Sequence, residues 1–121
     1  MTVRVLILDD SKICRIFLAN YLQDLLPKAQ IIQAESGDDA VAQAAKNDIQ
    51  LAILDYNVPD LTGLLVANKI RQSQPGCELA LLTANLMRSV EEQAEESGVR
   101  YYRKPITADV TRQILQDSHF I

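Results

Sequence analysis

The chain has 121 residues with a formal net charge of −4, and 48% of the residues are hydrophobic. This length fits one domain over residues 1–121, with enough apolar side chains for a packed core. The acidic balance argues against direct binding of nucleic acid or of an anionic membrane through a broad basic face. No apolar run approaches the ~18 residues of a membrane-spanning helix, and the N-terminus lacks a signal-peptide cleavage pattern. We therefore expect a cytoplasmic domain with neither a nucleic-acid nor a membrane partner.

Five short runs with apolar, β-branched or aromatic residues alternate along the chain with longer segments of helical periodicity. Each run ends at a polar or turn-forming residue, which is typical of a buried parallel strand. Most of the intervening segments place apolar residues three and four positions apart, which is typical of amphipathic helices, whereas the 88–97 segment is acidic and has only a weak apolar face. The predicted strands are residues 3–8, 30–34, 51–54, 78–84 and 100–103. The predicted helices run from after Ser11 to Pro27, over 38–46, from after Gly63 to Gln74, over 88–97, and onward from Thr107, which can cap the last one.

This alternation predicts an α/β fold in three layers, with a five-stranded parallel sheet between two layers of helices. Parallel strands joined by right-handed crossovers place helices on both faces of the sheet. The carboxyl ends of all strands then lie at the same edge, where α/β proteins bind their ligands. The polar and small residues that the pattern brings to this edge are Asp9, Asp10, Asp55, Asn57, Thr83, Ala84 and Lys104.

The chemistry of this edge favours a phosphoryl group and a magnesium ion. Three neighbouring carboxylates repel one another unless a cation neutralises them, and Mg²⁺ prefers such oxygen ligands together with water and phosphate. Lys104 adds a positive charge and Thr83 a hydroxyl donor, which are parts that stabilise a phosphoryl group during transfer. Asp55 is the candidate nucleophile, which would yield an aspartyl phosphate. Each residue alone has an ordinary explanation as a cap, turn or helix stop, so the argument depends on their convergence.

The motifs along the chain resemble those of a known family. They are LILDDS (6–11), LDYNVPDLTG (54–63), LLTAN (81–85) and YYRKPI (101–106). Each motif is weak alone, but the ordered set over the whole length resembles the receiver domain of two-component response regulators, including single-domain chemotaxis-type regulators. The resemblance implies a flavodoxin-like fold with strand order 2-1-3-4-5.

The resemblance also implies roles for the residues that match the family motifs. Asp55 would accept a phosphoryl group from a phosphohistidine of a sensor kinase or a histidine phosphotransfer protein. The magnesium ligands would be Asp10, Asp55 and the backbone carbonyl of Asn57, with Asp9 acting through water. The domain would therefore be a signalling phosphoacceptor that catalyses only its own phosphorylation and dephosphorylation.

Further roles follow from the same resemblance at the ends of the last two strands. Thr83 would donate to the phosphoryl oxygens and Lys104 would pair with them, while Ala84 leaves room for the group. The bond between Lys104 and Pro105 is expected to be cis, a conformation that only X–Pro bonds adopt at low cost. Tyr101 matches the aromatic residue that switches position when the family is phosphorylated.

Output and phosphate lifetime can be assigned to a second group of residues. Side chains alternate along a strand, so Tyr101 and Arg103 should share the face formed by the 88–97 helix, the 100–103 strand and the last helix. We expect a downstream protein to bind there. Asn57 and Asn85 lie two residues after Asp55 and Thr83, where they can orient or obstruct the hydrolytic water.

Other interpretations of the sequence remain open. A magnesium-dependent phosphohydrolase with an Asp nucleophile would share the chemistry, although it usually has a second acid where Asn57 stands. A flavin- or nucleotide-binding domain would need a phosphate-cradling loop after the first strand, where this chain has Asp9 and Asp10. A purely structural module requires the acids to be coincidental. The domain could be a stand-alone regulator, a phosphorelay intermediate, or the receiver part of a longer response regulator or hybrid kinase.

Overall fold

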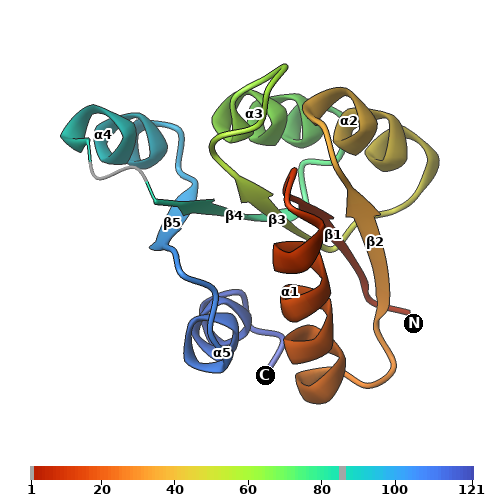
Figure 1. Ribbon diagram of the computed structural model, residues 1–121. Coiled ribbons are helices and arrows are strands. Elements are labelled where there is room, and N and C mark those ends of the chain that lie inside the picture. Colours follow the sequence, from red (N-terminus) through yellow and green to blue (C-terminus); the bar gives the residue numbers. More distant parts are fainter. Residues whose placement is uncertain (1, 85–86) are drawn as a thin grey trace.

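The computed structural model describes residues 2–84 and 87–121, in which strands and helices alternate from β1 to α5 (Figure 1). The strands are β1 (Arg4–Leu8), β2 (Gln30–Ala34), β3 (Leu51–Asp55), β4 (Glu78–Thr83) and β5 (Arg100–Arg103). The helices are α1 (Lys12–Leu25), α2 (Gly37–Lys46), α3 (Gly63–Ser73), α4 (Arg88–Glu96) and α5 (Ala108–Asp117). None of the helices in the described ranges is long and apolar enough to cross a membrane. The cytoplasmic location stays a prediction.

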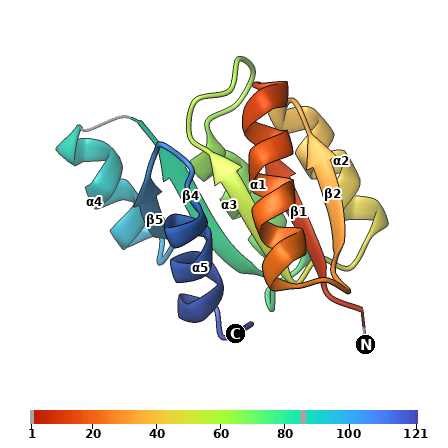
Figure 2. The same ribbon diagram turned by 60° about the horizontal axis from the view of Figure 1, so that its bottom comes forward.

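The strands form one parallel sheet in the order β2-β1-β3-β4-β5. Helices α2, α3 and α4 cover one face and α1 and α5 cover the other (Figures 1 and 2). The predicted three-layer fold and its 2-1-3-4-5 strand order are therefore confirmed. The order reverses between β1 and β3, so the carboxyl ends of these two central strands lie side by side at one edge of the sheet.

The central strand β3 shows why the sequence folds in this way. Its five residues are all buried. Ala52 and Leu54 belong to the hydrophobic cluster under α2, α3 and α4, whereas Leu51 and Ile53 belong to the cluster under α1 and α5. Successive side chains point to opposite faces of a sheet, so a continuous apolar run serves both clusters at once.

Four helices begin at a hydroxyl side chain that accepts a hydrogen bond from the backbone N–H three residues later. The pairs are Ser11 with Cys14, Ser36 with Asp39, Thr62 with Leu65, and Thr107 with Val110. These caps satisfy N–H groups that have no partner within the helix. The predicted cap at Thr107 is confirmed, and the caps fix where each connection after a strand ends.

The predicted boundaries differ from the observed ones by one or two residues at several places. Strand β3 extends to Asp55 instead of residue 54, and α4 ends at Glu96 instead of residue 97. The first strand begins at Arg4 instead of residue 3, and β4 ends at Thr83 instead of residue 84. The Lys104 backbone N–H donates to the Thr83 carbonyl at 3.0 Å, and beyond this bond the chain leaves the sheet. Helix α2 starts at Gly37, one residue earlier than predicted, because Ser36 is its cap.

Candidate functional site

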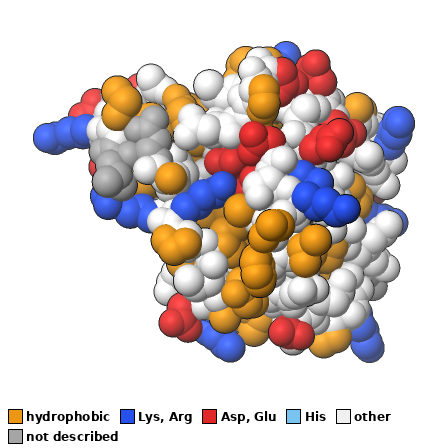
Figure 3. Space-filling model, viewed as in Figure 1, with side chains coloured by type: hydrophobic (Ala, Val, Ile, Leu, Met, Phe, Trp, Pro, Cys, Tyr) orange, Lys and Arg blue, Asp and Glu red, His pale blue; other side chains and the backbone are white. Residues whose placement is uncertain are grey.

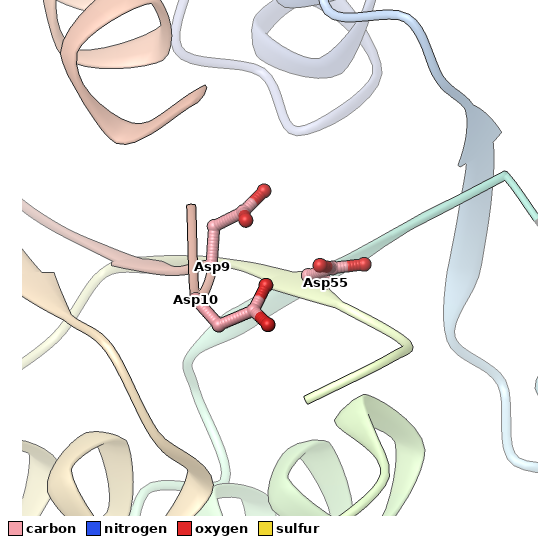
Figure 4. Close-up of side chains that lie close together, drawn as sticks. All are labelled: Asp9, Asp10 and Asp55. Atoms are coloured by element: carbon pink, nitrogen blue, oxygen red, sulfur yellow. The ribbon is translucent and has the colours of Figure 1, made fainter. Parts of the chain in front are cut away.

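Three carboxylates meet at the ends of β1 and β3. Asp9, Asp10 and Asp55 each offer a carboxylate oxygen, and these oxygens all lie within 4.8 Å of one another. Asp9 and Asp55 are buried, whereas Asp10 is exposed to solvent. Figure 4 shows the three side chains projecting close together from the two strand ends. The predicted convergence of these acids, which come from two separate parts of the sequence, is therefore present in the structure.

Lys104 supplies the positive charge at this cluster. Its Nζ donates to Asp9 Oδ2 at 2.8 Å and to Asp55 Oδ2 at 3.2 Å. The side chain reaches the acids from the connection that follows β5, and the bond between Lys104 and Pro105 is cis, as the resemblance implied. One ammonium thus neutralises part of the charge of two buried carboxylates.

Burial and charge shift the pKa values of the two groups in contact. Burial raises the pKa of Asp55 above its usual value, and the neighbouring Asp9 charge adds to this effect, while Lys104 opposes it. Burial alone would lower the pKa of Lys104, but the hydrogen bond to Asp9 and the charge of Asp55 raise it overall. Lys104 therefore stays protonated at neutral pH and stays available to a negatively charged ligand.

The loop between β3 and α3, residues 56–62, continues the site on the side of Asp55. The Asn57 backbone N–H donates to Asp55 Oδ1 at 3.3 Å, and Asn57 forms an antiparallel bridge with Thr62. The Tyr56 backbone N–H donates to the Leu82 carbonyl at 2.8 Å, which fixes the start of the loop against β4. Asn57 is exposed, as expected of a residue that borders a solvent-filled site.

The remaining predicted residues lie at the end of β4 or on β5. Thr83 is fully buried at the end of β4, next to the strand that carries Asp55, and Ala84 after it is exposed. Tyr101 and Arg103 lie on the α4 side of β5, where the Tyr101 hydroxyl donates to Glu91 and the Arg103 guanidinium pairs with it at 3.4 Å. Asn85, predicted to tune dephosphorylation, lies outside the described residues.

Two residues that sequence reasoning did not assign to the site contact its backbone. A Cβ at Gly63 would lie 2.3 Å from the Asp55 carbonyl oxygen, so only glycine allows α3 to start this close to β3. Arg15 Nη1 donates to the Asp9 carbonyl at 2.6 Å, which fixes the turn after β1. The glycine before an apolar helical segment was a signal for the first contact, whereas nothing in the sequence spacing points to the second.

The donor set fits a hard divalent cation. All three clustered side chains are carboxylates, and oxygen ligands of this kind suit Mg²⁺ better than zinc, which prefers imidazole and thiolate. Two carboxylates are buried and one is exposed, so a bound ion would be open to solvent on one side. Asp9, Asp10 and Asp55 could therefore hold such an ion while leaving coordination positions for water and phosphate.

Solved structures with similar folds include two bacterial response regulators. The chemotaxis protein CheY4 of Vibrio cholerae has a TM-score of 0.87 at 26% identity, covering 98% of this chain and 99% of that chain. The response regulator protein TrrA of Thermotoga maritima, solved in complex with Mg²⁺ and BeF, has a TM-score of 0.82 at 26% identity, covering 96% and 98%. The whole fold is thus shared with these proteins.

Curated relatives are longer proteins that contain a similar segment. The sensor histidine kinase RcsC of Salmonella typhimurium is 33% identical over 112 residues, covering 92% of this chain and 12% of that protein. A cyclic di-GMP phosphodiesterase of Thermotoga maritima is 30% identical over 109 residues, covering 89% and 28%. The chain therefore spans less than a third of the length of either relative. The family model for the response regulator receiver domain matches residues 5–116, and the chain accordingly belongs to the receiver domain family of two-component signalling systems.

Proposed function

We propose that Asp55 accepts a phosphoryl group from a phosphohistidine of a sensor kinase or a histidine phosphotransfer protein. The observation that carries this proposal is the position of Asp55 itself. Its carboxylate is almost fully buried, yet it lies beside two further acids and the Lys104 ammonium. A structural core would not gather these charges at a strand end, whereas phosphoryl transfer needs them there.

The side chains at and around Asp55 would have separate roles in the phosphoryl transfer. An Asp55 oxygen attacks phosphorus, the phosphorus–nitrogen bond to the donor histidine breaks, and the histidine nitrogen keeps that electron pair and takes up a proton. Mg²⁺ held by Asp10, Asp55 and the Asn57 carbonyl, with Asp9 acting through water, would neutralise charge on the phosphoryl oxygens. Lys104 would pair with one of these oxygens and Thr83 would donate to another.

The apolar surface beside the site favours a protein as phosphodonor. Ile13, Ile16 and Phe17 on α1 are exposed by 67, 45 and 52% of their area. Ile13 and Phe17 line a cavity of about 580 Å³ that is also bordered by Lys104 and Pro105. Figure 3 shows hydrophobic side chains gathered over α1, below the acidic side chains at the centre of the view. A donor protein whose histidine reaches Asp55 would cover this apolar surface.

A downstream protein would bind on the side of β5 opposite to Lys104. Tyr101 and Arg103 lie on β5 and both bind Glu91 of α4. Movement of Thr83 toward a phosphoryl group would open space for the Tyr101 ring and change this contact, which gives two states that phosphorylation can bias. A downstream protein would then bind the face formed by α4, β5 and α5. The function is that of a signalling switch, either as a separate regulator or as part of a longer kinase or regulator.

Mass spectrometry after incubation with Mg²⁺ and acetyl phosphate tests the phosphoacceptor. We expect one added phosphate in the wild type and in the control variant Asp24→Asn, because Asp24 is an exposed residue of α1. Asp55→Asn should stay unmodified. Phosphorylation of Asp55→Asn to the wild-type extent would show that another residue is the acceptor.

The lifetime of the phosphate tests the roles of Asn57 and Asn85. Neither amide is a base, so each can only orient or obstruct the hydrolytic water. Asn57→Ala and Asn85→Ala should therefore change the rate of dephosphorylation several-fold without preventing phosphorylation. Unchanged lifetimes in both variants would place the path of the water elsewhere.

A further inference from the structure

Asp60 joins the loop after β3 to the start of α2. Its Oδ1 accepts a hydrogen bond from the Gly37 backbone N–H and its Oδ2 accepts one from the Asp38 N–H, both at 2.8 Å. Asp60 lies in the 56–62 loop, three residues after Asn57, and the two partners lie 22 and 23 positions earlier in the chain. Both oxygens of one carboxylate thus bind two consecutive amides of a helix that is not its own.

This contact completes the cap of α2. Gly37, Asp38 and Asp39 are the first three residues of the helix, and their N–H groups have no acceptor within it. The Ser36 hydroxyl accepts from Asp39 at 3.1 Å. Asp60 accepts from the Gly37 and Asp38 amides, so all three amides have an acceptor. Ser36 and Asp60 therefore cap different amides of the same helix end. The start of α2 is therefore built to receive a carboxylate from the loop.

The side chain next to Asp60 shows the same close approach. A Cβ at Gly37 would lie 2.7 Å from Leu61 Cβ and 3.0 Å from Leu61 Cδ1, so no larger residue fits there without displacing the loop. Directly after the loop, the missing Cβ of Gly63 lets the chain pass against the Asp55 carbonyl. At the start of the loop, the Tyr56 backbone N–H donates to the Leu82 carbonyl at 2.8 Å. Contacts at both ends thus fix the segment that carries Asn57.

We propose that Asp60 is a positioning residue that holds the 56–62 loop against α2, so that the Asn57 backbone carbonyl is preorganised as a magnesium ligand. The carboxylate of Asp60 is engaged with α2 and does not contact the metal itself. A loop that is already ordered loses less entropy when its carbonyl binds the ion, and affinity rises accordingly. This inference rests on the proposed magnesium site at Asp10, Asp55 and Asn57.

Calorimetric titration of Mg²⁺ into matched variants tests this role. Asp60→Ala should raise the Kd for Mg²⁺ about tenfold. This is the lower end of the range of affinity losses seen when a residue that supports a metal ligand is removed. Asp60→Asn should recover part of the affinity, because its amide oxygen can still accept one of the two hydrogen bonds. Gly37→Ala should weaken binding as well, since its new Cβ pushes against Leu61 from the side of α2.

Ser36→Ala is the control for a purely structural effect. It removes a cap from the same helix end, and the lost hydrogen bond is to Asp39 of α2 and not to the loop, so it should lower the melting temperature and leave the Kd for Mg²⁺ unchanged. Hydrogen exchange of the backbone amides of residues 56–62 provides a second measurement. It should be faster in Asp60→Ala and unchanged in Ser36→Ala.

Three results would contradict the proposed magnesium site or the positioning role of Asp60. Absence of Mg²⁺ binding to the wild type would refute the proposed site, and the inference with it. Equal Kd values for the wild type and Asp60→Ala, with binding lost in Asp10→Asn, would overturn the positioning role alone. The same weakening in Ser36→Ala as in Asp60→Ala would also overturn it, because the effect would then follow from the stability of α2.

Discussion

The Lys104 ammonium lies 2.8 Å from the Asp9 carboxylate, although the two residues are 95 positions apart in the sequence. It also lies 3.2 Å from Asp55, so one positive charge serves both buried acids. Asp10 adds a third carboxylate at the exposed side of the cluster. The negative charges thus outnumber the positive charge of Lys104, and their mutual repulsion opposes folding when no metal is bound.

Asp10→Asn should therefore stabilise the metal-free protein while removing its response to magnesium. We expect the free energy of unfolding to rise by about 1 kcal/mol in EDTA, since one repulsive charge near the protein surface is removed. Wild type should gain stability with increasing Mg²⁺ concentration, and the variant should gain little. Urea unfolding at several Mg²⁺ concentrations measures both effects. If both proteins gained equal stability from Mg²⁺, Asp10 would not be a ligand.

Gly63→Ala should damage the site through the backbone. The new Cβ would lie 2.3 Å from the Asp55 carbonyl oxygen and 2.9 Å from Leu81 Cδ1, so α3 or β3 must shift. We expect a loss of about 1–3 kcal/mol in the free energy of unfolding, the usual range for overpacking, and slower phosphorylation of Asp55. Gly76→Ala is the matched control, because a Cβ at Gly76 meets nothing within 4 Å. Equal stabilities of the two variants would show that the contact at Gly63 relaxes freely.

The strands, the helices and the meeting of the acids could be predicted because they follow from local rules. The apolar run of β3 and the spacing of apolar residues on α1 depend only on nearby sequence, and the parallel topology then brings Asp9 and Asp55 to one edge. The contacts of Asp60 with α2 could not be predicted in this way. They depend on the path of a loop through space, and no periodicity in the sequence encodes that path.

Helix α4 illustrates the same limit. Its residues predicted only a weak apolar face, and in the structure Val90 and Ala94 are its buried side chains. Polar contacts also hold α4 in place. Glu91 of α4 binds Tyr101 and Arg103, and Arg71 of α3 donates to the Ser97 carbonyl at the C-terminal end of α4. These partners come from two other elements, so the sequence of the helix alone could not identify them.

Stability at alkaline pH should depend on Tyr102. Its hydroxyl donates to Asp117 of α5 at 2.7 Å. Burial, followed by this hydrogen bond, raises the pKa of Tyr102 from 10.0 to about 12. Folding thus favours the neutral phenol, and the resulting stability is complete below pH 10 and is lost as the pH rises toward about 12.

Tyr102→Phe tests this pH dependence. The variant cannot ionise at this position, so its free energy of unfolding should fall less than that of the wild type between pH 10 and about 12. At neutral pH the variant should be less stable, because it lacks the hydrogen bond to Asp117. Urea unfolding across this range measures the difference, and Tyr21→Phe serves as the control. If the free energy of unfolding fell in parallel with pH for the wild type and Tyr102→Phe, Tyr102 would not be responsible for the loss of stability at alkaline pH.

The contact between Glu91 and β5 should hold α4 in the state that the structure describes. Glu91 accepts a hydrogen bond from the Tyr101 hydroxyl and pairs with Arg103 at 3.4 Å. Val90 and Ala94 provide only a small apolar contact, so the removal of Glu91 should let the helix open more often. Glu91→Ala should therefore increase hydrogen exchange of the α4 backbone amides several-fold while exchange in β1 and β3 stays unchanged.

Two comparisons make this prediction specific. Glu92→Ala removes the neighbouring acid, whose partner Arg88 is 89% exposed, so exchange in α4 should stay close to that of the wild type. If phosphorylation acts through Thr83 and Tyr101, Mg²⁺ with acetyl phosphate should increase α4 exchange in the wild type, and should do so much less in Thr83→Ala. In Glu91→Ala the further increase should be small, because the contact that phosphorylation weakens is already absent. Equal increases in all three proteins would show that the signal reaches α4 by a route that does not include this contact.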